Sequence, residues 1–236
     1  MRLEDFSHGF DTLLNSYSRR DDFGTTDADI RLNEHEKSLF LTYAQEIYVL
    51  SLYNGRNSSE ESFEQTEELR RYLAPLVKEA EILPIENTTG ILGIDSKSKF
   101  FTLPEDLWFI TYEAALCAGQ TCESKYKQEV YPVRQDEYHK IRKNPFRGAN
   151  SRRALRLDLA DNVIEIISNN GVTSYYVRYL RKLKPIVLAY LGDETAIEGV
   201  STPTECELPD SLHQKILEIA VGLALQSKGI NRNENK

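Results

Sequence analysis

The 236-residue sequence is poor in cysteine, methionine and tryptophan, and it contains no long apolar run. Its three cysteines, Cys117, Cys122 and Cys206, are too sparse for a disulfide framework and fit a reducing compartment, or a particle assembled in one. No stretch of about 18 apolar residues occurs, so we expect no membrane span. The first residues, MRLEDFSHGF, lack a basic segment followed by an apolar core, and we therefore expect no secretory signal.

Motifs that carry known chemistry are also absent. The sequence has no GxxxxGK[ST] or GxGxxG stretch to hold a nucleotide phosphate, and no GxSxG turn for a serine nucleophile. Its four histidines have no second histidine three to five residues away; they are His8, His35, His139 and His213. Such isolated histidines do not predict a metal site. We therefore expect no metal, no cofactor, no catalytic residues and no enzymatic activity.

The charge of the chain is strongly uneven. The net charge is −8, but residues 134–184 contain 12 basic and 5 acidic side chains, which leaves 17 basic and 32 acidic side chains elsewhere. The protein thus has a basic middle between acidic flanks. A division of this kind bears on solubility and on the choice of partners, and not on the fold.

Helical periodicity occurs near both ends of the sequence. The first clear helix, over 34–53, starts at Asn33, which forms a capping box with Glu36. In this helix Phe40, Tyr43, Ala44, Ile47 and Leu50 recur at helical spacing, which predicts that they form the buried face. A second helix is expected over 62–74, with Ser62 and Gln65 as its capping box, and a third over 210–227, after Pro209 and before Gly229. We expect the three helices to pack together.

The middle of the sequence is rich in β-branched and aromatic residues, which favours strands. Strands are predicted near 99–103, 107–117, 125–133, 153–159, 162–168 and 174–182, with a short helix over 135–143. Turn residues at 161–162 and 169–171 predict that the last three strands form an antiparallel meander. The fold class is therefore α+β, a discontinuous helical bundle around an antiparallel β-sandwich or meander. The expected domains are a helical part (1–84), a β-rich part (85–205) and a C-terminal helix (206–236) that packs back on the helical part.

The basic run TSYYVRYLRKLKPIVLAYL, at 173–191, has three interpretations. The first is an edge strand whose charges block aggregation, and the second is a nucleic-acid-binding surface. The third is a contact surface for an acidic partner, including another copy of the chain. Arginine outnumbers lysine in this region, and its planar fork suits carboxylate contacts at interfaces. We hypothesise that six residues face a neighbouring subunit or another protein, namely Arg147, Arg152, Arg153, Arg178, Arg181 and Lys182.

Several segments resemble virion structural proteins of crAss-like bacteriophages. They are LEDFSHGFDTLLNSYS, LNEHEKSLFLTYAQEIYVLSLYNG, TLPEDLWFITYEA, KIRKNPFRG, YVRYLRKLKPIVL and ELPDSLHQKILEIAVGLAL, which together extend across nearly the whole chain. The order of elements also resembles podovirus adaptors of the tail tubular protein A type. Leu208, Pro209, Leu212, Ile216 and Ala220 match the C-terminal helix pattern of those adaptors.

The resemblance implies a ring-forming head–tail connector with no active site. Such a subunit would assemble in the host cytoplasm into a ring of 12 copies in the neck or tail of the virion. It would contact itself, the portal and other tail proteins, without any membrane, and DNA would pass through the ring at ejection without specific binding. The alternative is a nucleic-acid-binding protein that uses the basic 140–184 region directly. On the connector interpretation, the basic run is a subunit-contact surface.

Overall fold

A computed structural model describes residues 1–18, 31–56, 66–86, 92–118 and 126–228. The chain is a mixed α+β protein that divides into two compact units. Residues 1–75 and 183–236 form the first unit, and residues 76–182 form the second. The chain therefore leaves the first unit once and returns to it, at 75/76 and 182/183, whereas the boundaries expected from the sequence are 84/85 and 205/206.

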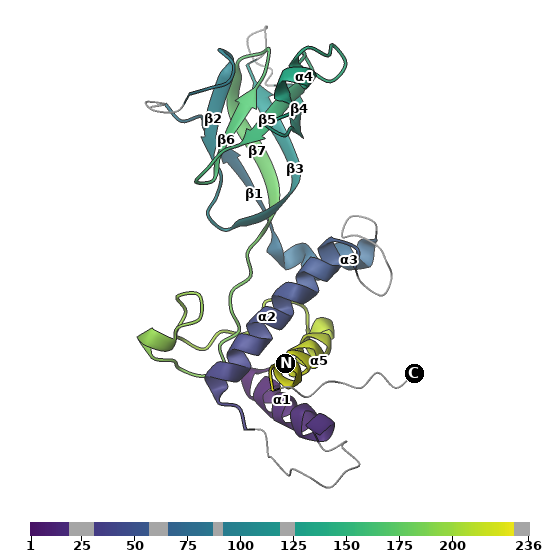
Figure 1. The fold of residues 1–236 in the computed structure, drawn as a ribbon, viewed down its shortest axis with the longest axis vertical. Helices are drawn as coiled ribbons and strands as arrows, with labels where there is room; N and C mark the ends of the chain where they lie inside the picture. The colour runs from purple at the N-terminus through teal and green to yellow at the C-terminus, as the bar shows by residue number, and fades with distance from the viewer. Residues whose placement is uncertain (19–30, 57–65, 87–91, 119–125, 229–236) are drawn as a thin grey trace. The chain divides into compact units, whose positions relative to one another are not determined.

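The first unit is helical (Figure 1). Its helices are α1 (Leu3–Ser18), α2 (Glu34–Tyr53), α3 (Glu67–Leu73) and α5 (Asp210–Ser227). Helix α5 packs against both α1 and α2. Gly9 allows the close approach of α1 to α5, because a Cβ atom at this position would lie 2.8 Å from Leu217 Cδ2. The capping box of α2 is confirmed, while Ser62 and Gln65 lie outside the described residues.

The face of α2 that turns inward differs from the expected one. Its buried residues include Ser38, Thr42 and Gln45, which we call the polar ladder, whereas Tyr43 and Ile47 are exposed. The polar ladder binds an extended segment, 184–188, that has few backbone partners of its own. Ser38 Oγ accepts the Leu188 N–H at 3.0 Å, Thr42 Oγ1 accepts the Ile186 N–H at 3.1 Å, and Gln45 Nε2 donates to the Lys184 carbonyl at 2.7 Å.

The reason for this orientation is the cost of unpaired backbone groups. A buried N–H or C=O without a partner is destabilising by about 1–3 kcal/mol, so the returning chain needs donors and acceptors where it crosses α2. Residues 38, 42 and 45 are spaced four and three apart on one helix face, and they meet residues 188, 186 and 184, spaced two apart on an extended chain. The prediction that Tyr43 and Ile47 lie on the buried face is wrong for this reason.

The second unit is a curled seven-stranded sheet with one short helix. Its elements are β1 (Val77–Ile82), β2 (Ser98–Thr102), β3 (Leu107–Cys117), β4 (Tyr126–Pro132), α4 (Tyr138–Arg142), β5 (Arg153–Asp158), β6 (Val163–Ile167) and β7 (Val172–Arg181). The strand order is β1-β7-β3-β4-β5-β6-β2. Neighbouring strands are antiparallel, except that β4 and β5 are parallel.

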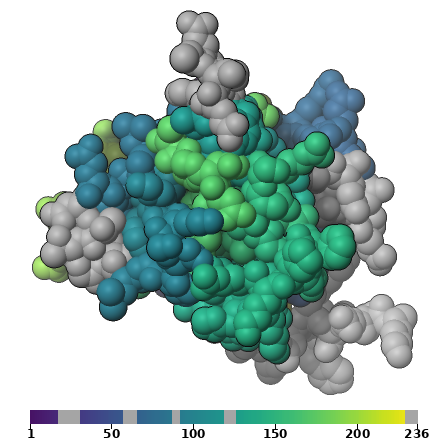
Figure 2. All heavy atoms as spheres, turned by 90° about the horizontal axis from the view of Figure 1, so that it is seen from above, coloured from purple at the N-terminus to yellow at the C-terminus, as the bar shows by residue number. Residues whose placement is uncertain are grey.

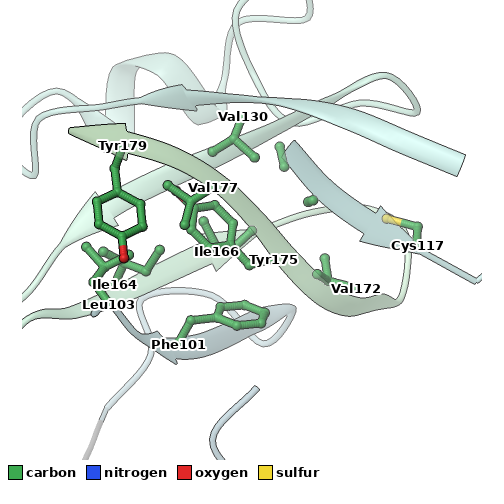
Figure 3. Close-up of a cluster of buried hydrophobic side chains, with 12 residues drawn as sticks. Phe101, Leu103, Cys117, Val130, Ile164, Ile166, Val172, Tyr175, Val177 and Tyr179 are labelled. Atoms are coloured by element: carbon green, nitrogen blue, oxygen red, sulfur yellow. The ribbon is translucent and has the colours of Figure 1, made fainter. Parts of the chain in front are cut away.

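The sheet curls until strands from distant positions share one core (Figure 3). Phe101 of β2, the last strand in the order, contacts Tyr175 of β7, the second strand, with ring centroids 5.7 Å apart. The side chains of Tyr175, Val177 and Tyr179 are buried in this core together with Ile164 and Ile166 of β6. The outer side of β5 and β6 is covered separately by α4, through Tyr138.

Two expectations about the sheet are wrong. Strands β5 and β6 form the predicted hairpin, but β7 does not continue it as a meander, because β5 and β2 already occupy both edges of β6. Strand β7 pairs instead with β1 and β3. It therefore has neighbours on both sides, and its arginines do not protect a sheet edge. Strand β1, at 77–82, was not predicted at all.

Candidate subunit-contact surface

The most exposed large side chain next to the predicted arginines is Phe146. It lies in the loop between α4 and β5, residues 143–152, which we call the Phe146 loop, and 85% of its surface is exposed. Arg147 and Arg152 are exposed in the same loop. No Asp or Glu occurs from Tyr138 to Leu157. The loop therefore presents the phenyl ring of Phe146 beside the exposed Arg147 and Arg152. No acidic residue lies near these arginines in the sequence.

Hydrogen bonds hold the Phe146 loop in a defined shape. Asn144 Oδ1 accepts the Phe146 N–H at 2.9 Å and the Arg147 N–H at 3.2 Å. Arg153, the first residue of β5, donates from Nη1 to the Phe146 carbonyl at 2.6 Å, and its guanidinium lies 4.3 Å from the centre of the Tyr131 ring. The Arg153 side chain is thus used within the chain. It positions Phe146 and is less available to a partner than Arg147 and Arg152.

A row of tyrosines and cations lies on the outer face of the sheet. Arg178 of β7 lies 3.4 Å from a carboxylate oxygen of Glu79 on β1 and donates to the Tyr176 hydroxyl at 2.9 Å. The Lys127 ammonium of β4 lies 4.9 Å from the centre of the same Tyr176 ring. Tyr176 donates to Glu79, and this hydrogen bond is the main reason why the pKa of Glu79 is lowered. Arg178 is therefore paired with neighbours on its own sheet.

The six predicted residues fall into separate places. Arg147 and Arg152 lie in the Phe146 loop and Arg153 begins β5. Figure 2 shows the blue-green segment of the chain that includes this loop as one contiguous area of the surface. Arg178 lies three strands away from β5 in the sheet order. Arg181 and Lys182 lie at the end of β7, where Arg181 donates to the Lys182 carbonyl. The sequence reasoning missed Phe146, whose one signal was an isolated aromatic residue in a basic, polar segment.

A buried group of ionisable side chains lies inside the curled sheet. Glu113 Oε2 accepts hydrogen bonds from Arg156 Nη1 at 2.8 Å and from the Tyr175 hydroxyl at 2.6 Å. The side chains of Arg156 and Glu113 are only 11% and 10% exposed. Burial raises the pKa of Glu113, although Arg156 and Tyr175 act in the opposite direction. Because these groups bind one another, we interpret them as a structural link between β3, β5 and β7.

The described part of the chain offers no metal centre. Among residues 1–18, 31–56, 66–86, 92–118 and 126–228, His, Cys, Asp and Glu side chains do not gather in groups of three or more that could hold a metal ion. Helices within these same ranges are too short or too polar to cross a membrane. The thiols of Cys117 and Cys206 are free, and Cys122 lies outside the described residues.

Comparison with known proteins identifies the family. The whole chain, residues 1–236, matches the family described as phage tail ring protein 3/4. The chain belongs to this family. It is 46% identical over 231 residues to Ring protein 3 of Bacteroides phage crAss001, covering 97% of this chain and 96% of that protein. It is also 29% identical over 233 residues to Ring protein 4/5 of the same phage, covering 95% of this chain and 92% of that protein.

The resemblance to crAss-like phage proteins is therefore confirmed. The chain is a structural ring protein of a crAss-like phage and a component of the virion. The related proteins are named for a ring, which points to a structural role in a multimeric assembly.

Proposed function

We propose that the protein is the subunit of a head–tail connector ring, assembled from about 12 copies between the portal and the tail. The ring would surround the channel through which DNA leaves at ejection, and its subunits would assemble in the host cytoplasm. The full-length match to phage tail ring proteins carries this proposal. The copy number, the position in the neck and the neighbouring proteins rest on the resemblance to tail tubular protein A adaptors.

The exposed cations supply the contact chemistry. Within the predicted set, Arg147 and Arg152 project their side chains from an ordered loop, whereas Arg153 and Arg178 bind groups of the same chain. We therefore assign the subunit contact first to Arg147 and Arg152. Exposed ion pairs contribute only about 0–1 kcal/mol each, but a ring repeats the same contact once per subunit, so their sum affects assembly more than folding.

Charge reversal at these two positions tests the proposal. The double variant Arg147→Glu, Arg152→Glu should keep the melting temperature of the wild type and should be incorporated poorly into rings or particles. The matched control, Arg134→Glu, reverses an exposed arginine near the other end of α4, whose partner Asp136 lies two residues away. Normal assembly of the double variant, measured by light scattering and by its content in purified particles, would show that these arginines only face solvent.

Nucleic-acid binding is the second candidate, because exposed tyrosines alternate with cations on the outer sheet face. Tyr112 and Tyr131 are exposed there; Arg153 lies over the Tyr131 ring, and Lys127 lies over the ring of Tyr176, which contacts Tyr112. Base stacking on such side chains supports single-strand binding. However, Glu129 accepts a hydrogen bond from the Tyr131 hydroxyl and Glu79 accepts one from the Tyr176 hydroxyl, and both carboxylates would repel phosphates. We expect weak, salt-dependent DNA binding; nanomolar affinity at physiological salt in a filter-binding assay would favour this candidate instead.

A further inference from the structure

Helix α2 carries a second apolar face that the described parts of the chain leave partly exposed. Phe40, Tyr43, Ile47 and Leu50, which we call the outer stripe, are spaced three, four and three residues apart and therefore share one side of the helix. Tyr43 is 57% exposed and Ile47 is 44% exposed, while Phe40 and Leu50 are half-buried. This spacing is the one used by helices that pack against a partner.

The surroundings of the outer stripe are acidic. Glu46 precedes Ile47, and its pKa is raised, first by burial and then by the nearby carboxylate of Glu198. The one lysine of α2, Lys37, is buried and binds Asp11 and Glu34 at 2.7 and 3.0 Å, so it does not offset this charge. An occupant of the outer stripe should therefore combine an apolar group with cations, because cations would relieve the repulsion between Glu46 and Glu198.

The same chain has a feature with this chemistry on its other unit. The Phe146 loop carries a largely exposed phenylalanine with Arg147 and Arg152 beside it. Arg153 and Asn144 fix the loop from behind, so little conformational freedom would be lost on binding. Apolar area would be covered on both surfaces, and cations would meet carboxylates at the rim, as at specific protein interfaces.

We propose that the outer stripe of α2 binds the Phe146 loop of a second copy of the chain. The contact joins two different surfaces of the chain. Each copy therefore uses its outer stripe to bind one neighbour and its Phe146 loop to bind the next. Such a head-to-tail contact generates a ring when the rotation between copies closes. The inference rests on the proposed ring function and adds the two surfaces that meet.

Site-specific photo-crosslinking tests the contact directly. A benzophenone amino acid is placed at Ile47, with the exposed Arg71 of α3 as the control position. Concentrated protein and assembled particles are irradiated, and the cross-linked peptides are identified by mass spectrometry. We expect Ile47 to be joined to a peptide within 138–153 of another copy, and Arg71 not to be. Cross-links between copies at other segments, or to a different protein, would overturn this contact and leave the ring proposal standing. An absence of any cross-link between copies would overturn both.

Two substitutions test the chemistry of the same contact. Phe146→Ser should weaken self-association about tenfold or more, because a central aromatic side chain often dominates an interface. The control Leu83→Ser removes another exposed apolar side chain of the same unit, one that is 73% exposed, and should have no effect. Glu46→Lys should also weaken association, and combination with Arg147→Glu should restore it. If circular dichroism shows both variants to be folded and they self-associate equally strongly, the proposal is contradicted.

Discussion

The two faces of helix α2 both carry apolar side chains, but only one of them is covered within the chain. The face turned outward carries Tyr43 and Ile47, and the face turned inward carries the polar Ser38, Thr42 and Gln45 beside the apolar Leu41, Ala44, Val49 and Leu52. Polar groups are buried here because they bind the backbone of the returning segment 184–188. The comparison teaches that an apolar stripe predicts a helix and a buried surface, but that the covering partner can be another molecule.

The largest expected effect on stability comes from a substitution on the inward face of α2. Gln45→Leu keeps the size of the side chain but leaves the Lys184 carbonyl without its donor at 2.7 Å. We expect a loss of about 1 kcal/mol in the free energy of unfolding, at the lower end of the range for an unsatisfied buried group, because the Lys184 carbonyl is only partly buried. Urea denaturation measures the change. An unaltered midpoint would mean that water replaces the Gln45 amide and that the polar ladder does not set the orientation of α2.

A smaller effect is expected on the outer face. Tyr43→Ser removes a large exposed aromatic side chain from the same helix, and it should change the free energy of unfolding by no more than about 0.5 kcal/mol, as surface substitutions usually do. The same urea titration compares it with Gln45→Leu. A loss as large as that of Gln45→Leu would show that the outer stripe is packed within the chain in solution, and the contrast between the two faces would fail.

The smallest effect concerns pH and Glu46, which lies beside the outer stripe. Burial and the carboxylate of Glu198 raise the pKa of Glu46 in the folded protein, so the folded state holds this proton more tightly than the unfolded chain. The Glu46 carboxylate therefore destabilises the fold as the pH rises through the raised pKa, and it has no such effect below the ordinary glutamate pKa of about 4.3.

Glu46→Gln removes this dependence. The variant should be slightly more stable than the wild type at pH 7, by less than about 1 kcal/mol because the site is half-exposed, and the gain should vanish near pH 4. Thermal unfolding of both proteins at pH 7, 5.5 and 4 measures the difference. A gain that persists unchanged at pH 4 would show that packing, and not charge, distinguishes the two side chains.

Local elements were predictable to different degrees. The strand over 107–117 and the helix over 210–227 have the predicted bounds, because β-branched and aromatic content and the Pro209 start are local signals. Strand β1 was missed because VKEAEI carries three charges in six residues. Those charges bind groups on neighbouring parts of the sheet unit; Lys78, for example, lies 2.6 Å from a carboxylate oxygen of Asp106. No local pattern marks such a strand.

The candidate surface was only partly predictable. Clustering of basic residues led to Arg147 and Arg152, but also to Arg153 and Arg178, which the structure pairs within the chain. Whether a surface arginine is available depends on side chains that are distant in sequence, such as Tyr131 for Arg153 and Glu79 for Arg178. Phe146 was overlooked for the complementary reason, since exposure of a single aromatic residue cannot be read from its sequence neighbours.

The sequence by itself determined the α+β composition, the helix cap at Asn33, most of the strands, the basic middle and the likeness to phage ring proteins. These properties depend on local periodicity, capping and composition, or on strings of residues that identify a family. Only the tertiary structure decided the strand order, the inward face of α2 and the arginines that remain unoccupied. Each of these is a choice between partners far apart in the chain, made by the need to pair every buried backbone group and to close the curled sheet around one core.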